Sequence, residues 1–336
     1  MTDKAIGRAF EQPFHDEAAV WLQWGNFEAA VLPNIGANLI AFRDTLNSIS
    51  FLREPAADQM DDFRARPIVH GIPLLFPPNR YEDGKFPWNG TTYNFPITEE
   101  ARNNHLHGFF HNAKFDLLDY GTTKTESFVV LSISVHKDHP IYTYLPHTFT
   151  IQLRYSLSEQ GLFQHVQVRN EGNDALPCLI AFHTTLNAPF DSASSSDDYR
   201  FQMTIGNRWE MSERMLPSGK FQPLLKEEEL MKSEGISPFW APMDNHYTAV
   251  PQNGRNQMVL TDTRTGTSLV YDVGTAYKQW MIYNNNATPG FFCPEPQTNL
   301  VNAPNVDIDA DTAGVVRLEP GGVWEETGRL YVKYGK

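Results

Sequence analysis

The chain has 336 residues, of which 41% are hydrophobic, 12% aromatic and 20% charged, a composition that supports a sizeable core and excludes a disordered chain. Its 27 Lys and Arg residues against 40 Asp and Glu residues give a formal charge of -13, which disfavours nucleic acid and anionic lipid surfaces as partners. Two cysteines, Cys178 and Cys293, are too few for a disulfide framework.

The N-terminal segment MTDKAIGRAFEQPFHDE has no apolar stretch of the kind that signal peptides contain. No run elsewhere approaches the ~18 consecutive apolar residues of a membrane span. We therefore expect a cytoplasmic protein without a membrane partner. Its oligomeric state stays open.

Short apolar segments separated by turn residues follow one another along the chain. Between residues 18 and 43, VWLQW, FEAAVL and NIGANLIAF predict two or three strands joined by tight turns. In FPWNGTTYNF, Asn89 and Gly90 lie between aromatic flanks. This pattern predicts a hairpin, because both central positions of a type I′ turn need φ > 0.

The later segments continue the same pattern. Residues 128–135 are an apolar run that passes into alternation, and residues 149–155 alternate apolar with polar side chains, so both segments predict half-buried strands. LPCLIAFH predicts a nearly continuous apolar strand leading to His183. Beyond Met258, strand-like segments are MVLTD, SLVYDV, QWMIYNN, GVVRL and GRLYVKY. Only residues 223–233 have helical spacing, and their charged run 226–229 is expected to face solvent.

Many short strands with turns every ten residues or so, and no crossover helices, are typical of an all-β sandwich or barrel. The sequence contains no internal repeat and no Pro/Gly/Ser-rich linker. We therefore expect one domain covering residues 1–336.

GIPLLFPPNR, residues 71–80, ends an apolar tract with Pro77 and Pro78. Proline fixes φ and donates no backbone hydrogen bond, so the apolar tract must stop there as a strand and turn outward. The segment then presents Asn79 and Arg80.

NNHLHGFFH, residues 103–111, spaces His105 and His107 two apart. If the backbone is extended, both imidazoles project from one face. Gly108 then allows a turn or a close approach to something bound.

Together, G-I-P-L-L-F-P-x-N-R and the following L-H-G resemble motifs of the aldose 1-epimerase (galactose mutarotase) family. AFHTTLN around His183, FFCPEPQTNLVNAPN around Glu295 and LEPGG at residues 318–322 are similar to later motifs of that family, in the same order. The resemblance implies a large antiparallel β-sandwich of the galactose mutarotase type, with few short helices and an open cleft over one sheet. It also implies interconversion of the α and β anomers of a free aldohexose without a cofactor or a metal.

By the resemblance, Glu295 is the base, His183 is the acid and His107 assists at the ring oxygen. Further residues expected to bind the sugar are Arg80, Asp244, Asn79 and Gln297. A nearby carboxylate raises the pKa of an imidazole, and an imidazolium favours an ionised carboxylate. We therefore expect a protonated His183 beside an ionised Glu295, with coupled titrations.

The chain departs from the family pattern at two places. Phe109 replaces a second glycine after L-H-G, and residues 184–187 replace the usual aromatic-Asn-Leu after the central histidine. The preferred sugar therefore stays open. Aromatic side chains that could pack against sugar CH groups are Trp240, Trp280, Tyr283, Phe109 and Phe110.

Three other functions compete with this interpretation. His105, His107 and His111 have the H-x-H-x3-H spacing of a cupin metal motif, but the glutamate and later histidine of that motif are missing. A hexose-6-phosphate epimerase of similar fold needs basic residues for a dianion, for which Arg80 and Arg102 are available. A non-catalytic sugar-binding protein would be expected to lack Glu295 or His183, and both are present.

Overall fold

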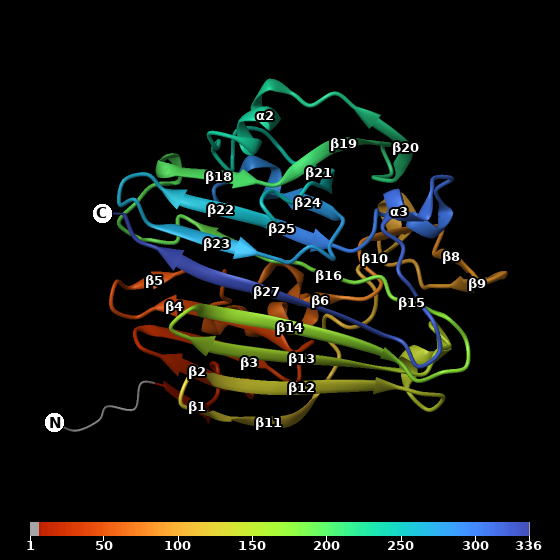
Figure 1. Ribbon diagram of the computed structural model, residues 1–336, viewed down its shortest axis with the longest axis horizontal. Coiled ribbons are helices and arrows are strands. Elements are labelled where there is room, and N and C mark those ends of the chain that lie inside the picture. Colours follow the sequence, from red (N-terminus) through yellow and green to blue (C-terminus); the bar gives the residue numbers. More distant parts are fainter. Residues whose placement is uncertain (1–6, 336) are drawn as a thin grey trace.

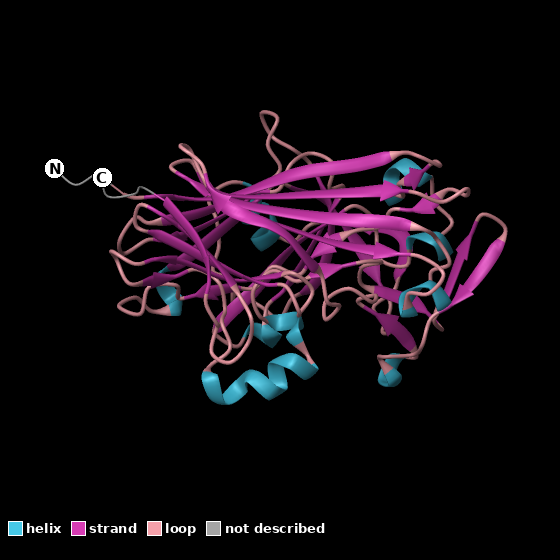
Figure 2. Ribbon diagram, turned by 90° about the horizontal axis from the view of Figure 1, so that it is seen from below, coloured by secondary structure: helices cyan, strands magenta, loops and turns pink. Residues whose placement is uncertain are grey.

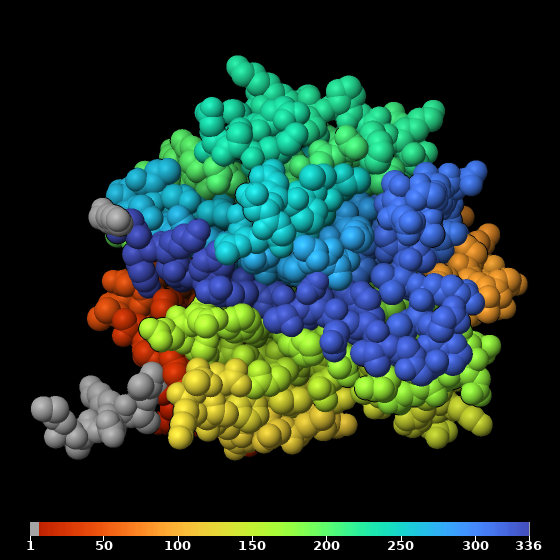
Figure 3. Space-filling view, in the orientation of Figure 1, coloured from red at the N-terminus to blue at the C-terminus, as the bar shows by residue number. Residues whose placement is uncertain are grey.

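Antiparallel strands make up most of the regular secondary structure in this computed structural model, which describes residues 7–335 (Figure 1). One layer is an eight-stranded sheet whose strands, in spatial order, are β11 (Asp116–Thr122), β12 (Ser127–Val135), β13 (Phe149–Ser158), β14 (Gly161–Asn170), β27 (Val323–Lys333), β23 (Ser268–Asp272), β22 (Gln257–Asp262) and β18 (Tyr199–Met203). The C-terminal strand β27 lies between β14 and β23, and its blue surface crosses the middle of the face seen in Figure 3.

The second layer contains another eight-stranded sheet. Its strands are β20 (Pro217–Gln222), β19 (Ile205–Met211), β21 (Asp244–Ala249), β24 (Gln279–Tyr283), β25 (Gly290–Gln297), β16 (Ala181–Phe182) and β6 (Leu74–Leu75), with β17 (Leu186–Ala188) paired to β25. A five-stranded sheet lies beside it and consists of β1 (Gly7–Glu11), β2 (Val20–Trp24), β3 (Phe27–Leu32), β4 (Asn38–Asp44) and β5 (Ile49–Ser50). Isolated bridges Leu39–Ile72 and Leu52–Leu186 join the two.

The remaining elements are small. Two-stranded pairs are β7 (Arg80–Glu82) with β10 (Asn104–Leu106), β8 (Lys85–Trp88) with β9 (Thr91–Asn94), and β15 (Leu176–Pro177) with β26 (Arg317–Leu318). The α-helices are α1 (Met60–Ala65), α2 (Lys226–Lys232) and α3 (Ala310–Ala313). The 3-10 turns are η1 (Ala57–Gln59), η2 (Pro67–Val69), η3 (Glu100–Arg102), η4 (Pro140–Thr143), η5 (Ser196–Asp198), η6 (Asn285–Ala287) and η7 (Ala303–Asn305). Figure 2 shows the helices at the margins of the strand layers. No helix between residues 7 and 335 is long and apolar enough to cross a membrane.

The apolar faces of the layers meet in one large core. In β13, Phe149, Ile151 and Leu153 are fully buried, while the residues between them are partly exposed, as the alternation predicted. These side chains join one cluster with Ile282 of β24 and Val31 of β3. Burial of one face of each sheet against the other is what defines a sandwich, and the predicted fold class is confirmed.

Local signals predicted some elements well and others poorly. Asn89 and Gly90 have φ of 48° and 78° and connect β8 to β9, so the predicted hairpin is confirmed. The apolar segment LPCLIAFH is not one strand. Its first residues belong to β15 and its later residues to β16, which lie in different sheets.

The predicted helix is present as α2, but α1 and α3 were not predicted. The charged run at the start of α2 is also not wholly exposed, which corrects the sequence prediction. Glu228 is fully buried and accepts hydrogen bonds from Arg208 Nη1 at 2.8 Å and from the Tyr247 hydroxyl at 2.6 Å. A buried carboxylate requires such partners. Through these hydrogen bonds, Glu228 connects α2 to strands β19 and β21.

Substitution of Glu228 by Ala should lower the free energy of unfolding by on the order of 2 kcal/mol, because Arg208 and the buried Tyr247 hydroxyl lose their common acceptor. The matched control is Glu229→Ala, which removes an exposed pair with Lys232 and should cost at most ~0.5 kcal/mol. Urea unfolding measures both values. Equal losses in the two variants would contradict the anchoring role.

Candidate active site

Three adjacent strands of the second sheet carry a row of side chains on one face. His246 of β21 is in register with Met281 of β24, which is in register with Glu295 of β25. Cross-strand partners in an antiparallel sheet point to the same side. Trp280 and Tyr247, which alternate with this row, belong to the buried core between the layers. The row therefore lies on the opposite face of the sheet.

His183 joins this row from the next strand. Ala181 of β16 is in register with Gln297 of β25, so continuing the register by two residues places His183 opposite Glu295. His183 Nε2 lies 3.2 Å from Glu295 Oε1, and the His183 backbone N–H donates to the Pro73 carbonyl at 3.0 Å. Strand pairing, not sequence proximity, brings the two groups together.

His107 reaches the same place from a loop. Strand β10 ends at Leu106, and His107 has φ of 69° and donates its backbone N–H to the Asn79 carbonyl at 2.9 Å. Its ring centroid lies 5.3 Å from that of His183, with the rings at 83°. His105 instead packs against Phe95 and donates Nδ1–H to the Pro96 carbonyl at 2.8 Å. The two imidazoles therefore have different neighbours. The shared face was predicted only for an extended backbone, and the left-handed φ of His107 means that this condition is not met.

Gly108 explains how L-H-G meets the proline-rich motif. Its φ is 65°, and a Cβ there would lie 2.3 Å from the Phe76 carbonyl oxygen and 2.4 Å from that of Pro77. Only glycine permits this approach without strain. The close contact is with the chain itself, and it fixes His107 beside residues 76–79.

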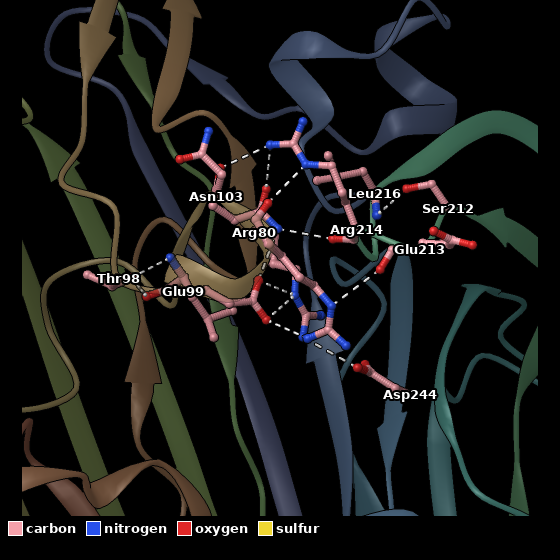
Figure 4. A network of polar contacts seen from close by, with 12 residues as sticks. Arg80, Thr98, Glu99, Asn103, Ser212, Glu213, Arg214, Leu216 and Asp244 are labelled. Carbon is pink, nitrogen blue, oxygen red and sulfur yellow. Dashed lines mark hydrogen bonds and ion pairs between the residues drawn. The ribbon is translucent and has the colours of Figure 1, made fainter.

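Arg80 is held between two carboxylates, as Figure 4 shows. Its Nε lies 3.0 Å from Glu99 Oε2 and its Nη2 lies 3.4 Å from Asp244 Oδ2. Burial opposes the charge, but Asp244 and Glu99 raise the pKa of Arg80, so the guanidinium stays charged. Arg102 also pairs with Glu99, at 2.8 Å. Arg80 is thus positioned with Asp244, as the sequence prediction required.

Several buried polar atoms at this place have no hydrogen-bond partner among the described residues. They include both side-chain polar atoms of Asn79 and Gln297, both carboxylate oxygens of Glu295 and Oδ1 of Asp244. The 3.2 Å contact of Glu295 with His183 is an ion-pair distance without hydrogen-bond geometry. An unsatisfied buried polar group costs ~1–3 kcal/mol, so a cluster of them is typical of a site that a polar ligand completes.

Burial controls the charge of the pair. Burial, with a contribution from Asp244, raises the pKa of Glu295 well above its ordinary value, and burial lowers the pKa of His183 to about 3. The predicted rise in the His183 pKa is therefore wrong, and the empty site favours a neutral imidazole beside a neutral carboxyl. This state holds the same single proton as the predicted charged pair. Only the position of that proton differs.

The five candidate aromatic residues divide into two groups. Trp280 and Phe110 are fully buried in the core, which excludes them as sugar platforms and corrects that expectation. Trp240, Tyr283 and Phe109 are partly exposed. Tyr283 is in register with Asp244 and therefore lies on the face that carries Glu295.

The three histidines of the cupin-like spacing do not converge. Within residues 7–335 no group of three or more His, Cys, Asp or Glu side chains is arranged to hold a metal ion. His105, His107 and His111 bond or pack with different partners: His105 with Pro96 and Phe95, His107 with His183, and His111 with the His107 carbonyl. The residues present do not fit a cupin metal centre.

Comparison with known proteins places this geometry in a family. The family model described as aldose 1-epimerase matches residues 19–331. The chain belongs to the aldose 1-epimerase family. This agrees with the resemblance of the motifs, and it makes a general epimerase chemistry the expectation for this site.

Solved structures of family members show the same fold. A galactose mutarotase-like protein of Clostridium acetobutylicum is 30% identical, with a TM-score of 0.93 over 97% of this chain and 98% of that chain. A galactose 1-epimerase of Lactobacillus acidophilus is 14% identical, with a TM-score of 0.70 over 98% of this chain and 99% of that chain. The Escherichia coli K12 protein YihR, which is uncharacterised, is 26% identical over 154 residues, 45% of this chain and 46% of its own length. The similarity to the Lactobacillus acidophilus protein shows the fold alone. The match to YihR covers about half of the length of YihR.

Substitution of Gly108 by Ala should destabilise this epimerase-family protein by more than Gly90→Ala. Both glycines have positive φ, at 65° and 78°, which costs Ala about 1 kcal/mol. Gly90 has no atom within 4 Å of an added Cβ, whereas Gly108 meets two carbonyl oxygens. Thermal unfolding should show the larger fall in Tm for Gly108→Ala. Equal shifts would mean that the loop moves freely away from residues 76–77.

Proposed function

We propose that this protein is an aldose 1-epimerase that interconverts the α and β anomers of a free aldohexose. The observation that carries the proposal is the buried pair of Glu295 and His183, 3.2 Å apart, beside unsatisfied polar groups on one face of a sheet. Anomer interconversion needs one group that takes a proton and one that gives a proton. A carboxylate and an imidazole that share one proton meet this need.

In the proposed reaction Glu295 removes the proton of the C1 hydroxyl, and His183 donates a proton to the ring oxygen. The bond between C1 and the ring oxygen breaks and an aldehyde forms at C1. Rotation about the C1–C2 bond exposes the other face of the aldehyde, and the reverse proton transfers close the ring. No atoms or electrons are gained or lost, so the two groups are ready for another turnover.

Substrate binding places the shared proton where the reaction needs it. A sugar hydroxyl that donates to Glu295 stabilises the ionised carboxylate, which has no hydrogen bond in the empty site. The proton then moves to His183, next to the ring oxygen. His107, whose pKa burial lowers well below its ordinary value, stays neutral and assists there as a hydrogen-bonding group.

We assign the binding of the sugar hydroxyls to polar side chains of the site, of which Arg80 is already held in place. Arg80 is held by Glu99 and Asp244, so its remaining N–H groups have a defined direction. Asn79, Gln297 and Oδ1 of Asp244 are unsatisfied in the empty site and gain hydrogen bonds when a sugar enters.

A hexose 6-phosphate is a second candidate substrate because of Arg66. Burial is the main cause that lowers the pKa of His183 and of His107, and the charge of Arg66 is a smaller one, which is consistent with a guanidinium in the neighbourhood of the two imidazoles. Arg66 is exposed and has no ion-pair partner between residues 7 and 335. For this second candidate, Arg66 is the cation assigned to the phosphate.

Replacement of Glu295 by Gln should slow anomer relaxation by ~10²- to 10⁴-fold, because an amide cannot accept the C1 proton. Polarimetry of freshly dissolved α-glucose, α-galactose and glucose 6-phosphate measures the rate. Glu319→Gln, an exposed substitution, is the control. If none of the sugars relaxes faster with wild type than with buffer, the proposed substrates are wrong. Sugar binding by wild type without any relaxation would indicate a binding protein.

The acid limb of the pH profile should lie well below the ordinary histidine pKa of ~6.5. Activity is lost on the acid side only when the pair binds a second proton, and burial lowers the pKa of His183 to about 3. We therefore expect kcat/KM to stay level as pH falls through ~6.5. Initial rates in buffers on both sides of that value provide the measurement. A decline centred near the ordinary histidine pKa would show that His183 is not held neutral.

A further inference from the structure

His246 is a buried polar residue in the same row as Glu295, and the proposed reaction does not use it. Its side chain belongs to β21 and only 2% of the residue is exposed. Its Nε2 has no hydrogen-bond partner within the described residues. An unsatisfied buried ring nitrogen is costly, so a ligand group in the cleft would relieve that cost.

The strand register places His246 on the same face of the sheet as Glu295. Its neighbours Asn245 and Tyr247 bond to Arg208 and Glu228 on the other side of β21, as alternation along a strand requires. His246 is in register with Met281, and Met281 with Glu295. Two steps between strands separate His246 from Glu295, which is about 10 Å between backbones.

Met281 lies between the two polar groups as a nearly buried apolar floor, 4% exposed. A pyranose ring placed over Met281, with C1 at Glu295, directs its opposite edge toward His246. That edge carries the hydroxyls on C3 and C4. The 2-hydroxyl, next to C1, lies on the Glu295 side.

The charge state of His246 suits a hydroxyl. Burial lowers its pKa to about 3, and the nearby charge of Arg80 adds to this effect. A neutral imidazole offers one donor and one acceptor, which matches a hydroxyl that both accepts and donates. The charged or titratable groups on or beside this face are Arg80, Asp244, Tyr283, Glu295, His183 and His107. Among the described residues, none of them forms a hydrogen bond or an ion pair with His246.

We propose that His246 is a specificity-determining residue that hydrogen-bonds the C3–C4 edge of the sugar. This inference rests on the proposed function, because it assumes C1 at Glu295. His246 would then discriminate among hexoses that differ at C3 or C4.

The test compares wild type with His246→Leu on glucose and on its 2-deoxy, 3-deoxy and 4-deoxy analogues. We expect His246→Leu to lower kcat/KM on glucose and 2-deoxyglucose by ten-fold or more, mainly through KM, as loss of a buried hydrogen bond predicts. On 3-deoxyglucose or 4-deoxyglucose the penalty should disappear, because the partner hydroxyl is already missing. His246→Gln, which keeps an amide N–H, should recover part of the loss.

A second measurement distinguishes failure of the proposed function from failure of the inference on His246. Calorimetry compares binding of the same sugars to the Glu295→Gln protein and to the Glu295→Gln, His246→Leu double variant. If wild type relaxes no sugar, the proposed function is wrong, and the binding series still tests His246. A penalty of equal size on all four sugars means that His246 is only structural and overturns the inference. His147→Leu, which removes a buried histidine bonded to the Tyr93 hydroxyl, should leave sugar selection unchanged.

Discussion

The site depends on the register of strands β16, β24 and β25. This register places His183 opposite Glu295 and leaves both groups buried without full hydrogen bonding. Burial of a carboxyl and an imidazole is costly unless they satisfy each other or meet a ligand. The rest of the fold provides the compensation, because the opposite face of the same strands packs Trp280 and Ile282 into the large core. One face of the sheet is thus stabilised by apolar packing, while the other carries buried polar groups that lack hydrogen-bond partners among the described residues.

Loop residues add further polar groups to the site that the strands form. The proline-rich segment carries Asn79 and Arg80 to the edge of the sheet, and the glycine at 108 lets His107 approach it. Glu99 and Asp244 then fix Arg80 from two directions. Each loop residue is held by a backbone contact or an ion pair, so these residues have defined positions.

Features with a local cause could be predicted from the sequence. The Asn89–Gly90 turn needs only its own φ angles, and the alternation in β13 needs only one buried face. The motif order predicted which residues gather: Asn79, Arg80, His107, His183, Asp244, Glu295 and Gln297. Features with a non-local cause could not be predicted. The burial of Glu228, the division of LPCLIAFH between two sheets and the position of His246 all depend on which strands pair. The charge state of the pair depends on burial, which the sequence prediction underestimated. A single domain and a cytoplasmic location stay predictions.

The position of β27 has a consequence for how the molecule is made. Strands β14 and β23 both pair with β27 and not with each other, so the first large sheet is divided until residues 323–333 pair with both. Up to that moment, the edges of the long strand β14 and the short strand β23 are unpaired, and unpaired edges attract other chains. Formation of the first large sheet therefore depends on β27, whose pairing with β14 and β23 removes both edges at once.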